Sequence, residues 1–228
     1  MSHPPGTVIV AAGEFLRFGG FVHSLLKMER PEGTHIHIEQ SVAICENLNG
    51  CIRRMADDSK WIWIQADDHI FPDGDELIRL LDREVDVVVP LMLRRSPPFV
   101  PVIYKDYLPG KGYKPFGYDE LPREGLFEVY AAGTGGMLVR REILEKIGDP
   151  WFTYAEGEKL NEDLHFCQKV RKHSKIYCDV EVTFGHRGTF TAWPIFDDER
   201  WGVGLNMGSS SNGKSNTIVV HATDVREE

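Results

Sequence analysis

The first 95 residues alternate between short apolar runs and segments with helical periodicity, and this alternation limits the possible folds more than any other feature. Residues 7–12, 61–66 and 85–93 are near-continuous apolar runs, and residues 34–38 alternate like a strand. Strands that are buried on both faces have such continuous runs. Because helical segments separate the runs, the pattern predicts a βαβαβαβ unit, an α/β fold whose parallel sheet is covered on both faces.

The helical segments between these runs carry apolar residues on one face. Residues 21–28 are expected to form the first helix. Ser41 is a candidate N-cap for a second helix that continues to residue 57, and a third helix passes through Leu77 and Leu80.

The second half of the chain is expected to be more irregular. Residues 97–125 are rich in Pro, Gly, Tyr and Lys, which predicts loops around one strand at 100–104. The remaining expected elements are strands at 126–132 and 137–140, helices at 141–147 and 162–172, and two short strands around Tyr177 and Val182. From Gly202 onward the composition is that of a flexible tail.

Charge and cysteine content narrow the class of protein. The formal net charge is −9 at pH 7, which disfavours non-specific attraction to nucleic acid. The basic cluster at 169–175 is either a local patch or the cationic end of a helix. The four cysteines form no CxxC pair, which favours free thiols in a reducing compartment. Since neither a signal peptide nor a run of about 18 apolar residues is present, we expect a cytoplasmic protein without membrane contact.

Two adjacent carboxylates, Asp67 and Asp68, follow the apolar run 61–66 directly. In an open α/β sheet, ligands bind in the crevice outside the carboxyl ends of the strands. Adjacent acids at such a point repel one another unless a positive group lies beside them, and a hard divalent cation would meet this need. A turn or a helix cap is the alternative explanation.

Three further signals lie in the second half. Glycines cluster at 133–136 after a strand, and they allow either a close approach of backbone to ligand or a tight turn. Glu162 and Asp163 open a helix, where they act either as helix-terminal charges or as a general base. His186 ends a strand and is either a second cation ligand or an ordinary histidine.

Taken in this order, the motifs resemble those of GT-A glycosyltransferases, in particular the compact branch related to family 2. The resemblance covers roughly residues 7–188, and it is most specific in the Glu-Asp-Leu-His-Phe-Cys sequence at 162–167 and the Gly-His at 185–186. It implies a GT-A-like, Rossmann-type, mostly parallel sheet flanked by helices, with an irregular acceptor-side half. The implied division is a single catalytic domain at 1–201, with a nucleotide-binding half at 1–95 and an acceptor half and lid at 96–201. A flexible tail would follow at 202–228.

The resemblance also implies roles for individual residues. Asp68 and His186 would hold Mn²⁺ or Mg²⁺. Asp163 would be the catalytic base of an inverting reaction, with Glu162 as its substitute, or would orient the acceptor in a retaining one. The candidate residues for binding the nucleotide-sugar donor are Ala12, Gly13, Glu14, Asn47, Asp67, Gly135 and Gly136.

The chain departs from the family pattern at two positions. Ala66 stands where the first acid of an Asp-x-Asp motif is usual, and Glu46 stands where relatives have Arg in an Arg-Asn pair. Residues 187–201 are expected to be irregular, and their aromatic residues, Trp193 and Trp201 among them, would either pack against the sheet or form a lid over a sugar.

The function that follows is a metal-dependent transfer of a sugar from a nucleotide sugar, for which we favour a UDP-sugar, to an acceptor hydroxyl. The acceptor stays open between a hydroxymethylated DNA base, as in a bacteriophage acting in its host's cytoplasm, a saccharide and a protein. One alternative is a nucleotidyltransferase, which would need a basic glycine-rich loop after the first strand. The other is a GT-A protein that binds nucleotide sugars without turnover, which the residue at 66 favours.

Overall fold

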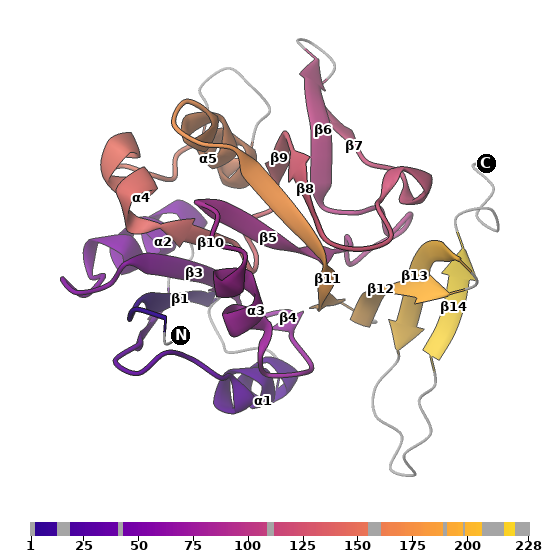
Figure 1. Cartoon of the computed structure of the whole chain (residues 1–228), viewed down its shortest axis with the longest axis horizontal. Helices are drawn as coiled ribbons and strands as arrows, with labels where there is room; N and C mark the ends of the chain where they lie inside the picture. The colour runs from indigo at the N-terminus through magenta and orange to yellow at the C-terminus, as the bar shows by residue number, and fades with distance from the viewer. Residues whose placement is uncertain are drawn as a thin grey trace.

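The computed structural model describes residues 3–12, 19–40, 43–108, 112–154, 161–188, 191–197, 199–206 and 217–221. Within these residues, an 11-stranded sheet carries helices on both faces, and a 3-stranded sheet lies beside it (Figure 1). The main path of the large sheet has the strand order β14-β13-β12-β11-β5-β10-β3-β1-β2.

The first half folds as the apolar runs predict. Its elements are β1 (Thr7–Ala12), α1 (Gly19–Lys27), β2 (His35–Gln40), α2 (Ile44–Arg53), β3 (Trp61–Ala66), β4 (His69–Ile70), α3 (Glu76–Asp82) and β5 (Val87–Met92). β1 pairs in parallel with both β2 and β3. Ser41 lies outside the described residues, and α2 begins after Ala43.

The second half contains more strand than its composition suggests. Its elements are β6 (Ile103–Leu108), β7 (Gly112–Pro115), the 3₁₀ helix η1 (Tyr118–Glu120), β8 (Leu126–Val129), β9 (Ala131–Ala132), β10 (Leu138–Arg140), α4 (Arg141–Ile147), α5 (Glu162–Arg171), β11 (Ile176–Arg187), β12 (Thr191–Asp197), β13 (Arg200–Asn206) and β14 (Thr217–His221). No helix in the described part of the chain is both long enough and apolar enough to cross a membrane.

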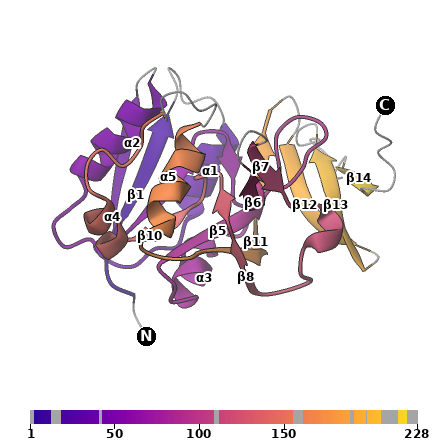
Figure 2. The ribbon, with the colours of Figure 1, turned by 90° about the horizontal axis from the view of Figure 1, so that it is seen from above.

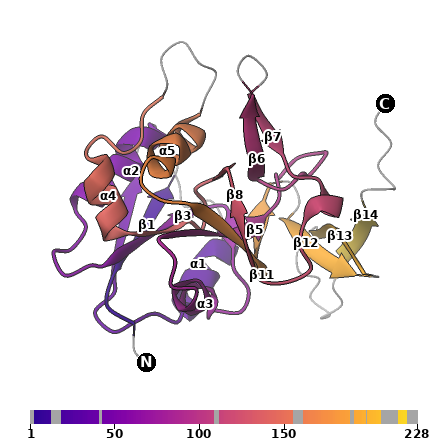
Figure 3. The same ribbon diagram turned by 45° about the horizontal axis from the view of Figure 1, so that its top comes forward.

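The side chains of β3 alternate between the two faces of the sheet, and both faces are buried. Trp61 and Trp63 belong to the core cluster on the side of α1 and α3, whereas Ile62 and Ile64 belong to the cluster on the side of α2, α4 and α5. Figure 3 shows the two groups of helices on opposite sides of the sheet. Successive side chains of a strand point to opposite faces, so a continuous apolar run fills both cores.

One edge of the sheet collects the carboxyl ends of several strands. β10 pairs antiparallel with both β3 and β5, and β11 pairs in parallel with β5. β1, β3, β5 and β11 therefore run in the same direction, and the loops that follow β3 and β5 leave at the same edge.

Two predicted elements differ from the structure in extent. The two short strands expected around Tyr177 and Val182 are one strand, β11, whose register shifts between Asp179 and Thr183. The strand expected at 126–132 is split, because β8 pairs with β11 whereas β9 pairs with β6 in the smaller sheet.

The segment expected to be irregular at 187–201 contains β12 and the start of β13, which belong to an antiparallel unit. β12 pairs with β13 over its whole length, and β13 pairs with β14. β13 continues to Asn206 and β14 follows, so strand structure extends beyond residue 202, where the sequence predicts a flexible tail. In Figure 2 this unit lies at the opposite end of the molecule from β1 and α2.

Trp201 packs into the protein rather than standing free. Its side chain is buried, and its indole Nε1 donates to the carbonyl oxygen of Pro122 at 2.9 Å. The ring of Phe196 lies against it, with centroids 5.3 Å apart. Packing thus accounts for this aromatic pair, one of the two explanations that the sequence leaves open.

Candidate functional site

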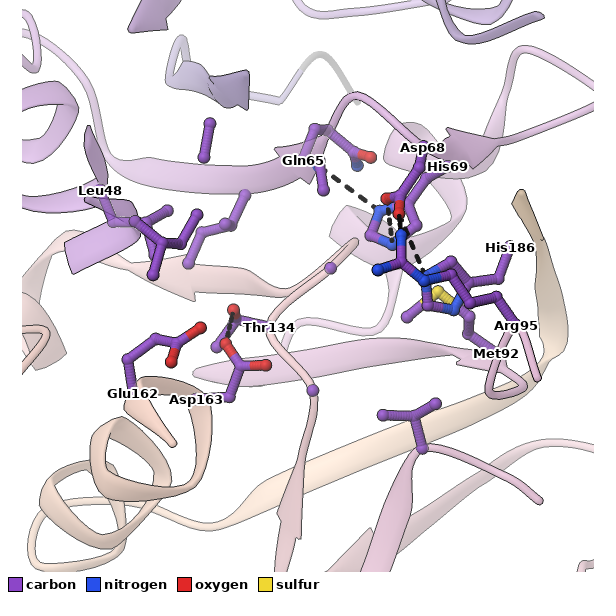
Figure 4. A pocket seen from close by; sticks show the side chains of 17 residues that line it. Leu48, Gln65, Asp68, His69, Met92, Arg95, Thr134, Glu162, Asp163 and His186 are labelled. Atoms are coloured by element: carbon purple, nitrogen blue, oxygen red, sulfur yellow. Dashed lines mark hydrogen bonds and ion pairs between the residues drawn. The ribbon is translucent and has the colours of Figure 1, made fainter. Parts of the chain in front are cut away.

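A cavity of about 360 Å³ lies at the edge of the sheet where β3 and β5 end. Its polar lining includes Gln65, Asp68, His69, Arg95, Asp163 and His186 (Figure 4). Loops that leave parallel strands form a ligand crevice at this edge in open α/β sheets. The cavity is therefore the candidate active site.

Three of the lining residues form a candidate metal site. Asp68, His69 and His186 each offer one ligand atom, and these atoms lie within 4.8 Å of one another. His186 Nε2 is 3.4 Å from Asp68 Oδ2, and His69 Nε2 is 3.6 Å from Asp68 Oδ1. The structure brings together the two residues that the sequence singles out as cation ligands, and it adds His69.

Backbone pairing holds the two histidines side by side. β4 pairs antiparallel with β11, and His69 and His186 are register partners in this pairing. The backbone N–H of Arg187 also donates to the carbonyl oxygen of Asp68 at 2.8 Å. Since cross-strand partners project from the same face of a sheet, the register itself makes the two imidazoles neighbours of the carboxylate.

The remaining nitrogen of each imidazole faces a backbone group. His186 Nδ1 is 2.8 Å from the carbonyl oxygen of Leu93, which can only accept, so Nδ1 is the donor, and Nε2 is the ring nitrogen that faces Asp68. The backbone N–H of Ala66 donates to His69 Nδ1 over a longer distance, 3.4 Å. Donation from Nδ1 to a carbonyl oxygen, as in His186, is the kind of contact that orients imidazoles that bind metals.

The charge states in the cluster suit a cation. Burial alone would raise the pKa of Asp68, but its hydrogen bond with His186 and the neighbouring positive groups lower it to about 2. Arg95 Nη1 lies 2.5 Å from Asp68 Oδ2 and is one of these groups. Burial lowers the pKa of His69 to about 4 although Asp68 opposes the shift. Metal ligation needs an ionised carboxylate and neutral imidazoles, and Asp68 and His69 meet this condition at neutral pH.

The ligand atoms of this cluster suit some divalent cations better than others. Mg²⁺ prefers oxygen ligands in a strict octahedral arrangement, whereas two of the three groups here are imidazoles. A carboxylate with two imidazoles fits Mn²⁺ better than Mg²⁺, and the same set suits Fe²⁺.

A second acidic group lines the cavity across from the cluster (Figure 4). Asp163 lies in the first turn of α5, and Thr134 Oγ1 donates to its Oδ1 at 2.5 Å. Burial raises the pKa of Asp163 to about 6, the negative charge of Glu162 adds to the rise, and the hydrogen bonds from Thr134 oppose it.

The helix cap at this point is a different residue. Asn161 is the N-cap of α5, and its Oδ1 accepts from the backbone N–H of Leu164 at 3.2 Å. Asp163 is therefore not needed as a cap. A carboxylate held in a cavity with a pKa near neutrality has the properties of a general base.

Packing explains the two glycines that the sequence proposes as donor-binding. A Cβ at position 135 would lie 1.9 Å from Cε1 of His69, so the imidazole occupies the space that a side chain would need. Gly136 has a φ of +77°, and a Cβ there would lie 2.5 Å from Cγ of Pro90. Gly135 lines the cavity, whereas Gly136 serves the turn before β10.

Two of the other proposed donor-binding residues, Ala12 and Asn47, meet at the end of β1. Asn47 Nδ2 donates to the carbonyl oxygen of Ala12 at 3.2 Å, which ties α2 to β1. Gly13 and Glu14 lie outside the described residues. Asp67 is buried, and its side chain does not line the cavity.

Sequence reasoning missed His69 and Arg95. His69 directly follows the two acids, but only its pairing with β11 makes it a neighbour of His186. Arg95 is 27 positions beyond Asp68, and nothing in the spacing indicates their contact. A histidine within two residues of an acidic pair at a strand end is the one sequence signal that was available for His69.

Comparison with known proteins identifies the fold. No protein-family model matches the chain, and no curated protein does. Among solved structures, A197 from the virus STIV matches with a TM-score of 0.56 and 14% identity over 82% of this chain and 88% of that one. GalNAc-T7, solved with UDP, GalNAc and Mn²⁺, matches with a TM-score of 0.50 and 11% identity over 79% of this chain and 43% of that one.

A weaker match is 4-diphosphocytidyl-2C-methyl-D-erythritol synthase from Anaerococcus prevotii, with a TM-score of 0.47 and 11% identity over 76% of this chain and 87% of that one. At such identities a match speaks for the fold alone. The chain has a GT-A-like fold, as its resemblance to that class predicts.

Proposed function

We propose that the protein is a glycosyltransferase that uses Mn²⁺ and a nucleotide-sugar donor, with UDP-sugars the favoured donors. The observation that carries the proposal is a single cavity with a candidate cation site on one side and a buried carboxylate of raised pKa on the other. In such a reaction the cation binds the diphosphate of the donor, whereas the carboxylate acts on the hydroxyl of the acceptor. The two groups are therefore needed on different sides of the cavity. The UDP, GalNAc and Mn²⁺ in the GalNAc-T7 structure, a protein of similar fold, support the choice of donor and cation.

Asp68, His69 and His186 would hold the cation. A bound divalent cation supplies Lewis-acid stabilisation to the diphosphate that leaves. Loss of one such electrostatic contact costs about 3 kcal/mol in other enzymes. Arg95, half-exposed beside Asp68, adds a second positive group at the same side of the cavity.

Asp163 would act on the acceptor. In an inverting reaction the acceptor oxygen forms a bond to the anomeric carbon while the bond from that carbon to the phosphate oxygen breaks, and the diphosphate keeps the electron pair. The acceptor proton passes to a carboxylate oxygen of Asp163, whose raised pKa improves it as a base. In a retaining reaction Asp163 would instead orient the acceptor hydroxyl.

Thermal stabilisation tests the donor and the cation together. The wild-type protein is melted with a panel of nucleotides and nucleotide sugars, with and without Mn²⁺, Mg²⁺ or Fe²⁺, beside the variants Asp68→Asn and Asp163→Asn. A ligand that binds the native state raises Tm by mass action. We expect a Mn²⁺-dependent shift with UDP and UDP-sugars that Asp68→Asn removes and Asp163→Asn keeps.

Turnover distinguishes the rival functions. UDP release from a UDP-sugar, with a hydroxymethylated DNA, a saccharide or a protein as acceptor, supports glycosyl transfer, and Asp163→Asn should lower it at least 100-fold. Pyrophosphate release from a nucleoside triphosphate would indicate a nucleotidyltransferase. Nucleotide-sugar binding without turnover on any acceptor would indicate a binding protein. If no nucleotide shifts Tm, the proposal is wrong.

A further inference from the structure

Gln65 buries a carboxamide without hydrogen bonds. Its side chain has no exposed surface, and neither Oε1 nor Nε2 has a hydrogen-bond partner among the described residues. Buried polar groups nearly always find partners, since an unsatisfied one loses its hydration without compensation. The unsatisfied carboxamide of Gln65 therefore lowers the stability of the free protein, so a role other than folding has to explain its presence.

The position of Gln65 indicates where its partner would lie. Gln65 is next to last in β3, three residues before Asp68, and it lines the same cavity. Figure 4 shows its carboxamide at the end of β3, on the side of the cavity where Asp68 and His69 lie. The group therefore stands next to the candidate cation site rather than deep in the apolar core.

The chemistry of the group narrows the ligand. A carboxamide offers two N–H donors and one acceptor oxygen close together, and hydroxyl groups both donate and accept. In a nucleotide sugar whose diphosphate lies at Asp68 and His186, the rings bonded directly to the diphosphate are the parts nearest to this site. Both of these rings carry hydroxyls.

We infer that Gln65 is a specificity-determining residue that hydrogen-bonds a ring hydroxyl of the donor, on either the ribose or the transferred sugar. The inference rests on the proposed function and deepens it. It gives the unsatisfied carboxamide a role, because the hydrogen bonds missing in the free protein form when the donor enters.

The variant Gln65→Met tests the inference, because methionine has a similar length and no hydrogen-bonding need. Binding is measured by calorimetry in the presence of Mn²⁺ with UDP, with a UDP-hexose and with the 2′-deoxy and 3′-deoxy forms of UDP. Melting of the free protein is measured beside it. We expect Tm of the free variant to rise and its affinity for the UDP-hexose to fall by about three- to tenfold, the range of one neutral hydrogen bond.

A contact with the ribose and a contact with the transferred sugar would change the measured affinities in different ways. If the partner is the ribose, UDP and the UDP-hexose lose affinity by the same factor, and one of the deoxy nucleotides binds wild type and variant equally. If the partner is the transferred sugar, UDP keeps its affinity and only the UDP-hexose loses it. Either result supports a donor contact and identifies the ring.

Thr34 provides the matched control. Its Oγ1 is also buried without a partner among the described residues, but it precedes β2 and so lies at the opposite edge of the sheet from the cavity. Thr34→Val should leave every ligand affinity within twofold. If Gln65→Met also leaves every affinity within twofold, the inference is overturned. That outcome differs from failure of the proposed function, in which the wild-type protein itself binds no nucleotide.

Discussion

His69 and His186 are register partners in the antiparallel pairing of β4 with β11, and their ring centroids lie 5.0 Å apart beside the carboxylate of Asp68. A two-residue strand thus completes a three-residue cluster that the acids alone would not form. Because the register of a ladder is set by its backbone hydrogen bonds, the imidazoles are held in place before any cation arrives.

Replacement of His186 by alanine should weaken Mn²⁺ binding at least tenfold. The substitution removes one of three candidate ligands, the one whose Nδ1 is fixed by the carbonyl oxygen of Leu93 at 2.8 Å. Titration of Mn²⁺ followed by electron paramagnetic resonance of the free ion measures the affinity. His35→Ala is the control, since His35 is an exposed imidazole on the edge strand β2 and should leave the affinity unchanged. An equal effect of the two substitutions would contradict the proposed ligand set.

Replacement of Gly135 by alanine should displace the imidazole of His69. The new Cβ would lie 1.9 Å from Cε1 of His69, so the ring has to move away. We expect a loss of about 1–3 kcal/mol in the free energy of unfolding, the usual cost of overpacking, together with weaker Mn²⁺ binding. Urea denaturation and the Mn²⁺ titration measure the two effects.

Two further variants make this test specific. In the background of His69→Ala, the change of Gly135 to alanine should cost far less, because the clashing ring is gone. Gly19→Ala, at the start of α1 with no atom near its would-be Cβ, should leave stability unchanged or slightly higher. Additive costs for Gly135→Ala and His69→Ala would show that the two positions do not contact each other.

The apolar runs determine what the sequence could predict. β1 and β3 have the bounds that the runs indicate, because a strand buried on both faces admits few polar residues and so is visible in the sequence. α4 also has the expected bounds, with Gly148 directly after its last residue. These signals are local, and each is complete within one segment of chain.

The strands that the sequence did not predict have the composition of loops. β12 contains Pro194, and β13 contains Gly202 and Gly204, residues that are depleted in strands. Their pairing is antiparallel and local to the C-terminal unit, so composition alone favoured a lid and a tail. The bulge in β11 between Asp179 and Thr183 likewise interrupts its apolar pattern and made one strand resemble two.

The residues of the candidate site also divide into those that have a local sequence signal and those that have none. Asp68, Asp163 and His186 each end or begin an element, so motif order was enough to propose them. Arg95 and Gln65 become candidates only in the folded structure, and only the fold pairs His69 with His186. Ladder register, a long-range ion pair and an unsatisfied carboxamide have no local sequence signature.

Asp163 should give the reaction a pH limb near 6. Burial raises its pKa to about 6, and a general base has to be ionised, so activity should rise as the pH passes through this value and then level off. The pH profile of kcat/KM measures the limb, and Asp163→Asn should remove it along with most of the activity. A profile of the wild-type enzyme that is flat between pH 5 and 7 would argue against this base.

The same carboxyl group should lower stability as pH rises. Its folded-state pKa lies above its ordinary value of 3.8, so between pH 4 and 6 the folded state holds more protons than the unfolded state. Stability contributed by the protonated form is fully present below about pH 4 and is lost as the pH rises through 6. Asp163→Asn keeps an oxygen that can accept from Thr134 but carries no charge. Its free energy of unfolding should therefore exceed that of the wild type by about 1–3 kcal/mol at pH 8 and by little at pH 4. An equal difference at both pH values would show that burial does not raise the pKa of Asp163.

Arg95 should compete with the cation for Asp68. Its Nη1 lies 2.5 Å from Asp68 Oδ2, the oxygen that also faces His186 Nε2, so an arriving cation meets a positive group already on its carboxylate. Without nucleotide, Arg95→Ala should bind Mn²⁺ about three- to tenfold more tightly than the wild type, a modest change because the guanidinium is half-exposed. Arg94→Ala is the control of equal charge, since Arg94 reaches toward the hydroxyl of Tyr104 instead. If nucleotide diphosphate draws Arg95 away from Asp68, the advantage of Arg95→Ala should shrink when UDP is added. Weaker Mn²⁺ binding by Arg95→Ala than by Arg94→Ala, in contrast, would mean that the arginine supports the carboxylate rather than competing for it.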